Sequence, residues 1–310
     1  MKNKTTKNLI EAIDKKYNAI NQDKNVYLEG LLHSKTINYW DYVHTDALLN
    51  LQIQRTNLPD EMVFIGYHQI NELIFKMILW ELQQVAEAEV LEVNFFTDKL
   101  MRVSRYFDML TSSFSIIQEG MDVEQYNKFR HTLTPASGFQ SAQYRKIEFA
   151  STELINLIDA RFRKTIDRDT PFEHALEHLY WQAAGKDYKT GKKSILLTNF
   201  ENRYKEEFIT FMKVYNTKNL WSRYKELSEE DQKNKDLVAA MRHYDYTVNI
   251  TWVIAHFNAA KHYILATSGD GEATGGSNWQ KYMHPKYQKR IFFPELWTSE
   301  EIENWGQNLD

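Results

Sequence analysis

Apolar residues recur at intervals of three and four along most of this chain, which is the spacing of one face of an α-helix. The clearest runs cover residues 38–51, 60–90, 97–118, 123–133, 140–161 and 236–266. Pro59 and Asp60 punctuate the chain before the second run, and Asp60 is a residue type that caps helix N-termini. The pattern predicts an all-α protein.

Two stretches follow the pattern less clearly. Residues 1–35 are polar and weakly periodic, which predicts an N-terminal extension that needs another surface to pack against. Residues 160–240 are rich in charge with apolar positions at helical spacing, which predicts peripheral helices. Neither an internal repeat nor a convincing linker is present, so we expect a single domain over residues 1–310.

Composition narrows the possible chemistry. The 310 residues include 43% hydrophobic and 14% aromatic side chains, enough for a sizeable core, and only 11 glycines and 5 prolines. The absence of cysteine excludes disulfides, thiolate ligands and thiolate nucleophiles. The net charge of −4 argues against nucleic acid as a partner, and no apolar run is long enough for a membrane span. We expect a cytoplasmic protein in which the histidines are the main candidates for catalysis and ligand binding.

Arg130 stands at the start of a loop rich in proline and glycine. It follows Tyr126 by four residues, so both side chains share a helix face and could converge on one anion. The alternative is a salt bridge that ends a helix before a turn. The sequence leaves both interpretations open at this point.

Two histidines lie on helices among aromatic residues. His68 shares a narrow arc with Phe64, where the imidazole could hydrogen-bond the N–H of a ligand while the aromatic ring stacks on the apolar body of that ligand. His256 lies one turn after Trp252 and before Ala259 and Ala260, whose small side chains could leave room for a flat macrocycle with an axial imidazole. For each, a buried core histidine is the alternative.

Two further features are weaker. His174 and His178 have metal-ligand spacing, but neighbouring glutamates indicate a solvated face and no third ligand is evident. The glycine-dense stretch 269–277 lacks the Walker lysine and a preceding strand, so a lid that presents Thr274 is a better interpretation than a phosphate loop.

Six blocks follow one another along the chain: Tyr39-x-x-Tyr42, Phe64-x-x-x-His68-Gln69-x-x-Glu72-Leu73, Tyr126-x-x-x-Arg130, Thr134-Pro-Ala-Ser-Gly-Phe-Gln-Ser141, Trp252-x-x-x-His256 and Thr274-Gly-Gly. Taken in this order, they resemble the tryptophan 2,3-dioxygenase family. The resemblance covers roughly residues 36–150 and 245–297. It implies one large helical haem-binding domain in a homotetramer, with an N-terminal helix that reaches a neighbouring protomer.

The resemblance also implies a role for each matching residue. His256 would be the axial ligand of the haem iron, and His68 the distal histidine near the indole N–H. Arg130 with Tyr126 would hold the amino acid carboxylate. The other implied substrate contacts are Phe64, Ser137, Gly138 and Thr274 of the same chain and Tyr39, Tyr42 and Val43 of the adjacent protomer.

The implied reaction uses ferrous haem b to add both atoms of O2 across the indole C2–C3 bond of L-tryptophan. The product, N-formylkynurenine, opens the kynurenine pathway of tryptophan catabolism. Three departures from the family pattern are a longer stretch between His256 and Thr274, Ala273 where glycine is typical, and valine instead of leucine at Val43. A smaller side chain in the pocket wall could admit a substituted indole. A related haem oxygenase of secondary metabolism is therefore the alternative.

Overall fold

The computed structural model describes residues 5–130, 138–265, 283–307 and 309. Contacts divide the chain into two compact units, Met1–Gln52 and Ile53–Asp310. Within the described residues the structure is helical, and its β pairing is limited to two isolated bridges. The predicted all-α fold is confirmed.

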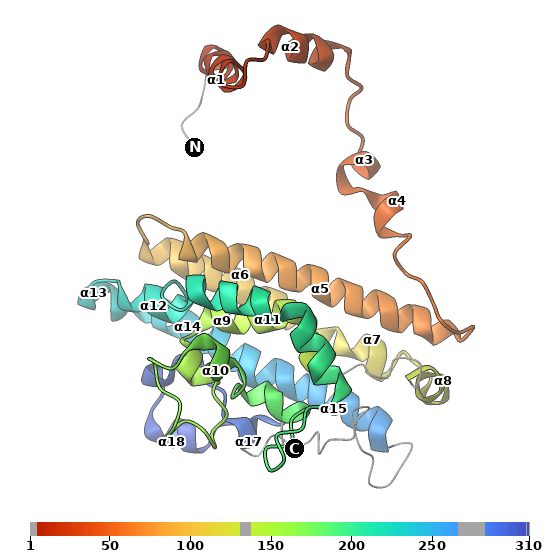
Figure 1. Cartoon of the computed structure of the whole chain (residues 1–310), viewed down its shortest axis with the longest axis vertical. Helices are drawn as coiled ribbons and strands as arrows, with labels where there is room; N and C mark the ends of the chain where they lie inside the picture. The colour runs from red at the N-terminus through yellow and green to blue at the C-terminus, as the bar shows by residue number, and fades with distance from the viewer. Residues whose placement is uncertain (1–4, 131–137, 266–282, 308, 310) are drawn as a thin grey trace. The chain divides into compact units, whose positions relative to one another are not determined.

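The first unit is a string of short helices (Figure 1). They are α1 (Thr6–Asn18), α2 (Lys24–His33), α3 (Tyr39–Val43) and α4 (Thr45–Leu48). Tyr17 and Tyr27 stack with ring centroids 4.1 Å apart and join α1 to α2. His44 takes a left-handed conformation with φ of 58° and separates α3 from α4. None of these four helices has a buried residue.

The second unit holds the core. Its longer helices are α5 (Pro59–Ala86), α6 (Val93–Ser112), α9 (Ala142–Ser151), α11 (Ile195–Tyr215), α14 (Lys235–Tyr246) and α15 (Trp252–Leu265). Its shorter elements are α7 (Phe114–Gln118), α8 (Val123–Phe129), η2 (Gly138–Gln140), η3 (Leu154–Leu157), α10 (Phe172–Leu176), η4 (Tyr180–Ala184), α12 (Leu220–Lys225), α13 (Glu229–Gln232), η5 (Thr247–Thr251), α17 (Pro285–Gln288), η6 (Pro294–Leu296) and α18 (Ser299–Glu303).

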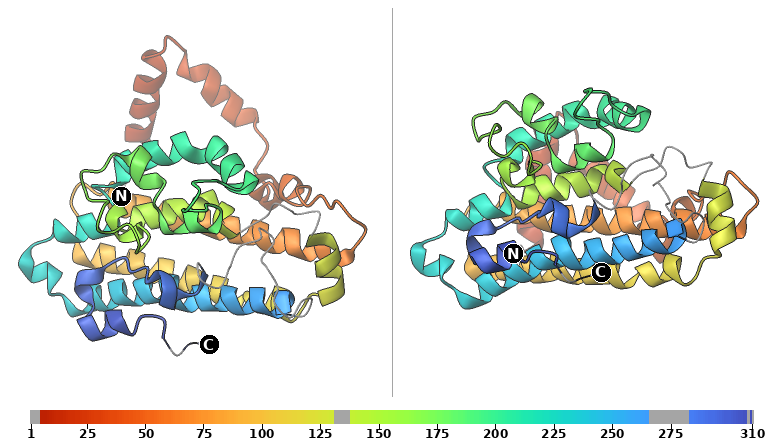
Figure 2. Two further views of the ribbon diagram at one scale, coloured as in Figure 1. Left: turned by 60° about the horizontal axis from the view of Figure 1, so that its bottom comes forward. Right: turned by 90° about the horizontal axis from the view of Figure 1, so that it is seen from below.

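The core forms where α6 lies between α5 and α14 (Figures 1 and 2). Residues spaced by three and four along α6 are at most 1% exposed, which places one complete helix face against its neighbours. That face is Phe96, Leu100, Val103, Phe107 and Leu110. α5 contributes Ile78 and Leu82 to the same cluster and also packs against α9. The helix that carries Phe64 and His68 thus packs against this apolar core.

The start of α5 differs from the prediction. Leu58 is the N-cap and Pro59 occupies the first turn, because a proline at that position loses no intrahelical hydrogen bond. The carboxylate of Asp60 instead accepts a hydrogen bond of 2.6 Å from the backbone N–H of Asp122. Asp60 therefore ties α5 to the start of α8 and does not cap its own helix.

Two predicted helices are shorter or interrupted. The run over residues 140–161 forms α9 only to Ser151, because Thr152 is extended with φ of −147°. The run over residues 236–266 is α14 and α15 separated by η5, a π-helical turn. A π turn inserts one extra residue per turn, which rotates the faces of the two helices relative to a continuous α-helix.

Within residues 160–240, α11 and α12 each bury one face, whereas α13 buries no residue. Trp181, Phe208 and Trp221 are at most 2% exposed and belong to the main core cluster. In the part of the chain that the structure describes, no helix has both the length and the apolar character to cross a membrane.

Candidate functional site

The first part of the site is on α5, where Phe64 and His68 lie one turn apart. Their ring centroids are 4.0 Å apart, as helical spacing predicts. Tyr67 meets His68 edge-on at 5.4 Å. The two aromatic rings therefore crowd the imidazole, while part of the residue remains accessible to solvent.

The hydrogen bonding of His68 fixes its tautomer. Nδ1 lies 2.8 Å from the carbonyl oxygen of Phe64, and a carbonyl can only accept, so Nδ1 carries the proton. Burial lowers the pKa of His68, because the surrounding protein solvates the charged ring poorly, although the Phe64 carbonyl and Glu72 oppose the shift. The neutral ring presents Nε2 as a hydrogen-bond acceptor.

The second part is on α8, which brings Tyr126 and Arg130 toward Phe64. The rings of Phe64 and Tyr126 are 6.1 Å apart, and the guanidinium of Arg130 lies 5.8 Å from the Tyr126 ring. Burial raises the pKa of Tyr126, while the charge of Arg130 opposes that shift. The phenol is thus neutral, and Arg130 supplies the positive charge at this end of the site.

The third part is on α15, where His256 lies between aromatic rings. Phe114 stacks on the imidazole with centroids 5.6 Å apart and an interplanar angle of 12°. The ring centroid of Trp252, one turn earlier, is also 5.6 Å from that of His256. Neither ring nitrogen of His256 has a hydrogen-bond partner within the described ranges.

The surroundings keep His256 neutral. Burial lowers its pKa to about 4, and the charge of Arg145 and any proton on His68 act in the same direction. Ring contacts join the two sites: Tyr67, which meets His68, also lies 6.0 Å from Phe114, which stacks on His256, so both imidazoles border one aromatic cluster. A neutral imidazole with a free lone pair is the form that ligates a metal.

A cavity of about 60 Å³ adjoins His256 and is lined by Gly138, Trp252 and Arg145 among others. A Cβ added to Gly138 would lie 3.1 Å from Cε1 of His256, so a larger residue would press on the imidazole. Ala259, predicted to leave room here, instead packs with Tyr67 and Phe114. The approach of Gly138, rather than a gap at Ala259, shapes the space beside the ring.

One wall of this cavity is cationic. The guanidinium groups of Arg145 and Arg290 share the fully buried carboxylate of Glu148, at 3.0 and 2.8 Å. Tyr180 also donates to Glu148, at 2.5 Å. Two buried cations on one carboxylate leave a surplus of positive charge.

Two donors in this wall are not satisfied. Nε of Arg145 and Nε1 of Trp252 are buried without a hydrogen-bond partner. Unpaired buried donors are costly, and a bound acceptor would satisfy them. Together with the surplus charge, they suit a ligand that carries carboxylates. The cavity is far smaller than a haem, so a haem on His256 requires Gly138 to lie farther from the ring.

The other predicted residues have different outcomes. Tyr39, Tyr42 and Val43 lie in the first unit, with exposures of 73%, 77% and 40%. Ser137 and Thr274 lie outside the described residues. His178 directs Nδ1 to the carbonyl of His174, at 2.9 Å, so one of its nitrogens is already committed within the helix.

Phe114, Arg145 and Arg290 were missed by sequence reasoning. The signal for Arg145 was an Arg–Glu pair at i,i+3 with Glu148 in an otherwise apolar stretch, close to the Pro-Gly block. Phe114 and Arg290 had no local signal, because their contacts with His256 and Glu148 join residues far apart in the chain.

The fold and the site define a class: an all-α protein in which two neutral imidazoles from separate helices face one region beside a cationic wall. The family model described as tryptophan 2,3-dioxygenase matches residues 29–270, and the chain belongs to this family. The family is haem-dependent.

Curated relatives of the same family align with this chain along nearly their whole length. A tryptophan 2,3-dioxygenase from Ruegeria sp. (strain TM1040) is 30% identical over 274 residues, which cover 84% of this chain and 91% of the relative. One from Geobacillus thermodenitrificans (strain NG80-2) is 29% identical over 294 residues, covering 90% and 98%.

Proposed function

We propose that the chain is a haem-dependent dioxygenase that adds both atoms of O2 across the indole C2–C3 bond of L-tryptophan to give N-formylkynurenine. The observation that carries the proposal is the neutral His256, with no hydrogen bond to its ring nitrogens among the described residues, facing the neutral His68. The names of the relatives favour tryptophan over the substituted indole that Val43 suggested.

His256 would hold the haem iron through its free nitrogen, with Phe114 fixing the plane of the imidazole. Nε of Arg145 and Nε1 of Trp252 would donate hydrogen bonds to carboxylate groups of the cofactor. When bound, the haem supplies the redox chemistry that activates O2. The protein's task is to orient the substrate and to exclude water.

The substrate would lie between α5 and α8. Nε2 of His68 would accept the indole N–H, because Nδ1 is already committed to the carbonyl of Phe64. The ring of Phe64 would line the indole pocket, and Arg130 would bind the carboxylate beside the phenol of Tyr126. Ser137, Gly138 and Thr274 complete the proposed set.

We place Tyr39, Tyr42 and Val43 in the pocket of an adjacent protomer within a homotetramer. All three are exposed, and the helices of the first unit bury nothing, so this segment has apolar surface to offer a partner.

The test is aerobic turnover by haem-loaded protein under reducing conditions. We expect N-formylkynurenine from L-tryptophan, and a Soret band that His256→Ala abolishes. His68→Ala should retain substantial turnover, because an acceptor that orients the indole is not an indispensable base. Haem binding without any product from L-tryptophan would refute the proposed reaction.

A further inference from the structure

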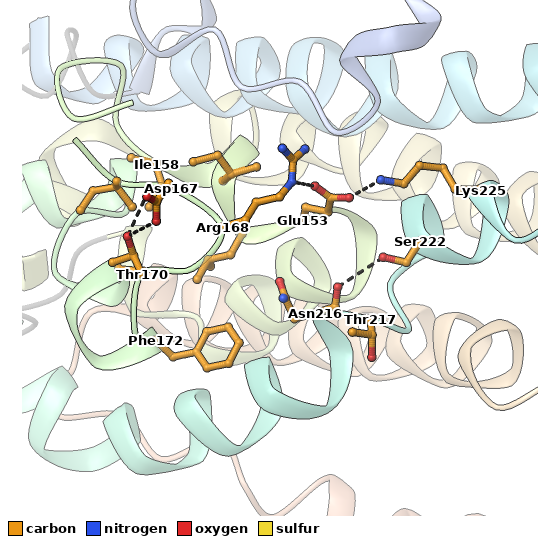
Figure 3. Close-up of a pocket in the computed structure, with 14 residues that line it drawn as sticks. Glu153, Ile158, Asp167, Arg168, Thr170, Phe172, Asn216, Thr217, Ser222 and Lys225 are labelled. Carbon is orange, nitrogen blue, oxygen red and sulfur yellow. Dashed lines mark hydrogen bonds and ion pairs between the residues drawn. The ribbon is translucent and has the colours of Figure 1, made fainter. Parts of the chain in front are cut away.

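A second cavity, of about 370 Å³, lies far from His256 in the sequence and shares no lining residue with the first. It is bounded by the segment from Glu153 to Ala175 on one side and by the turn from α11 into α12 on the other (Figure 3). Its volume is in the range of pockets that hold small organic molecules.

The floor of this cavity is apolar. Ile158 and Ile166 are 1% and 4% exposed and line it together with the half-buried ring of Phe172. The two isoleucines are already almost fully buried, so a ligand with a hydrocarbon or aromatic body would gain mainly by leaving water itself and by covering the half-buried ring of Phe172.

The rim of the cavity carries two cations on one carboxylate (Figure 3). Glu153 accepts a hydrogen bond of 2.8 Å from Nε of Arg168 and another from Nζ of Lys225. Burial raises the pKa of Glu153, but these two hydrogen bonds outweigh it and the pKa lies below its usual range. The carboxylate is therefore charged. Arg168 and Lys225 outnumber Glu153 at this end of the cavity, while Asp167 elsewhere in the lining makes the cavity neutral as a whole.

Arg168 has donors to spare. Its guanidinium uses Nε for Glu153, and its two terminal nitrogens have no partner in the parts of the chain described here. The other acid at the cavity, Asp167, is engaged within its own turn by the hydroxyl of Thr170 at 2.8 Å and the N–H of Asp169 at 3.1 Å. Paired terminal nitrogens of an arginine match a carboxylate in two parallel hydrogen bonds.

We propose that this cavity binds a small organic carboxylate with an apolar body. The carboxylate lies on the terminal nitrogens of Arg168 near Lys225, and the body lies on Ile158, Ile166 and Phe172. The inference does not depend on the proposed dioxygenase activity, since the residues of that site are elsewhere.

The test is calorimetry on the full-length, haem-loaded protein with 3-phenylpropionate as the probe. We expect a Kd of about 1 mM or tighter, and weaker binding of the neutral analogue 3-phenylpropan-1-ol. Arg168→Gln should raise the Kd about tenfold, because it removes a charge-assisted contact. Phe172→Ala should also weaken binding, which tests the apolar floor separately.

Two control variants separate this cavity from other sites. Arg105→Gln removes an exposed arginine of α6 and should leave the Kd unchanged. Arg130→Gln reports binding at the proposed tryptophan pocket, so loss of the signal in that variant alone would overturn the assignment. Absence of binding up to about 10 mM, or an equal Kd in Arg168→Gln, would overturn it as well.

Binding of L-phenylalanine tests whether the cavity prefers a simple carboxylate to an amino acid. Because Asp167 is committed to its own turn, we expect no gain from an α-ammonium group, and L-phenylalanine should bind no more tightly than 3-phenylpropionate. Clearly tighter binding of the amino acid would contradict the assignment to simple carboxylates.

Discussion

His68 and His256 illustrate how the same surroundings set the charge of two imidazoles on different helices. Burial lowers the pKa of both rings, and a proton on His68 would further disfavour one on His256. Near neutral pH both are uncharged, so one can accept a hydrogen bond and the other can ligate a metal. Their roles differ because Nδ1 of His68 already donates to the Phe64 carbonyl, whereas neither ring nitrogen of His256 has a hydrogen bond within the described residues.

The depressed pKa of His256 sets the pH range of haem binding. With a pKa of about 4, the ring competes for a proton only in strong acid, whereas an unperturbed histidine would do so below about 6.5. We therefore expect haem affinity to hold steady as the pH falls from neutrality and to drop near pH 4. Spectrophotometric haem titrations across this range, with circular dichroism to verify folding, measure it. A midpoint near 6.5 would contradict the assignment.

Arg130 provides the second test at this scale. Removal of the guanidinium by Arg130→Ala should cost substrate binding about 2 to 4 kcal/mol once water is excluded, because a charge-assisted contact is lost. KM should rise strongly while the haem content stays the same. Steady-state kinetics and the Soret absorbance measure the two quantities. An unchanged KM would rule out Arg130 as the carboxylate anchor.

The π turn between α14 and α15 links α15, the helix that carries His256, to the rest of the core. Asn249, at its centre, donates to Asp245 at 2.6 Å and accepts from Nε of Arg290. Asp245 in turn accepts the backbone N–H groups of Phe292 and Phe293, at 2.9 and 3.0 Å. The C-terminal segment is thereby fastened to the helix that carries His256.

Asn249→Ala should lower the free energy of unfolding by about 2 to 4 kcal/mol, because it leaves a buried guanidinium and a buried carboxylate each short of one partner. Thr251→Ala, at an exposed position of the same turn, is the matched control and should change stability by less than about 0.5 kcal/mol. Urea denaturation compares the two variants. Equal free energies of unfolding for the two variants would show that the hydrogen bonds of Asn249 do not stabilise the fold.

The elements also show which features could be predicted from sequence. Helical periodicity located α5, α6 and α8 and placed Phe64 beside His68, because these features repeat within a few residues. The π turn and the shared carboxylate of Glu148 could not be predicted, because they depend on partners such as Arg290, 142 residues away. The motif resemblance proposed roles for His68 and His256, but local spacing alone left each as a possible core histidine.

For the whole molecule, the outer face of α5 indicates assembly. Ile70, Leu73, Met77 and Trp80 recur at helical spacing and are 45%, 46%, 46% and 62% exposed. A continuous apolar stripe on the longest helix is typical of a surface that another subunit covers. This stripe supports the proposed homo-oligomer independently of the family.

Trp80→Glu should therefore shift the protein toward smaller species, because a charge in a covered apolar interface is not solvated. Val90→Glu, at another exposed apolar residue in the loop after α5, is the control and should leave the size unchanged. Sedimentation velocity at several concentrations distinguishes the species. A monomeric wild type would contradict the proposed assembly.

The helices before Gln52 contain no buried residue, and this has a consequence for how the enzyme behaves in solution. If Tyr39 and Tyr42 complete a neighbour's pocket, catalytic competence is a property shared between chains and obeys mass action. Turnover per chain should then decline on dilution, and saturating substrate should oppose that decline by favouring the associated form. The abundance of the protein would itself set the activity of each copy.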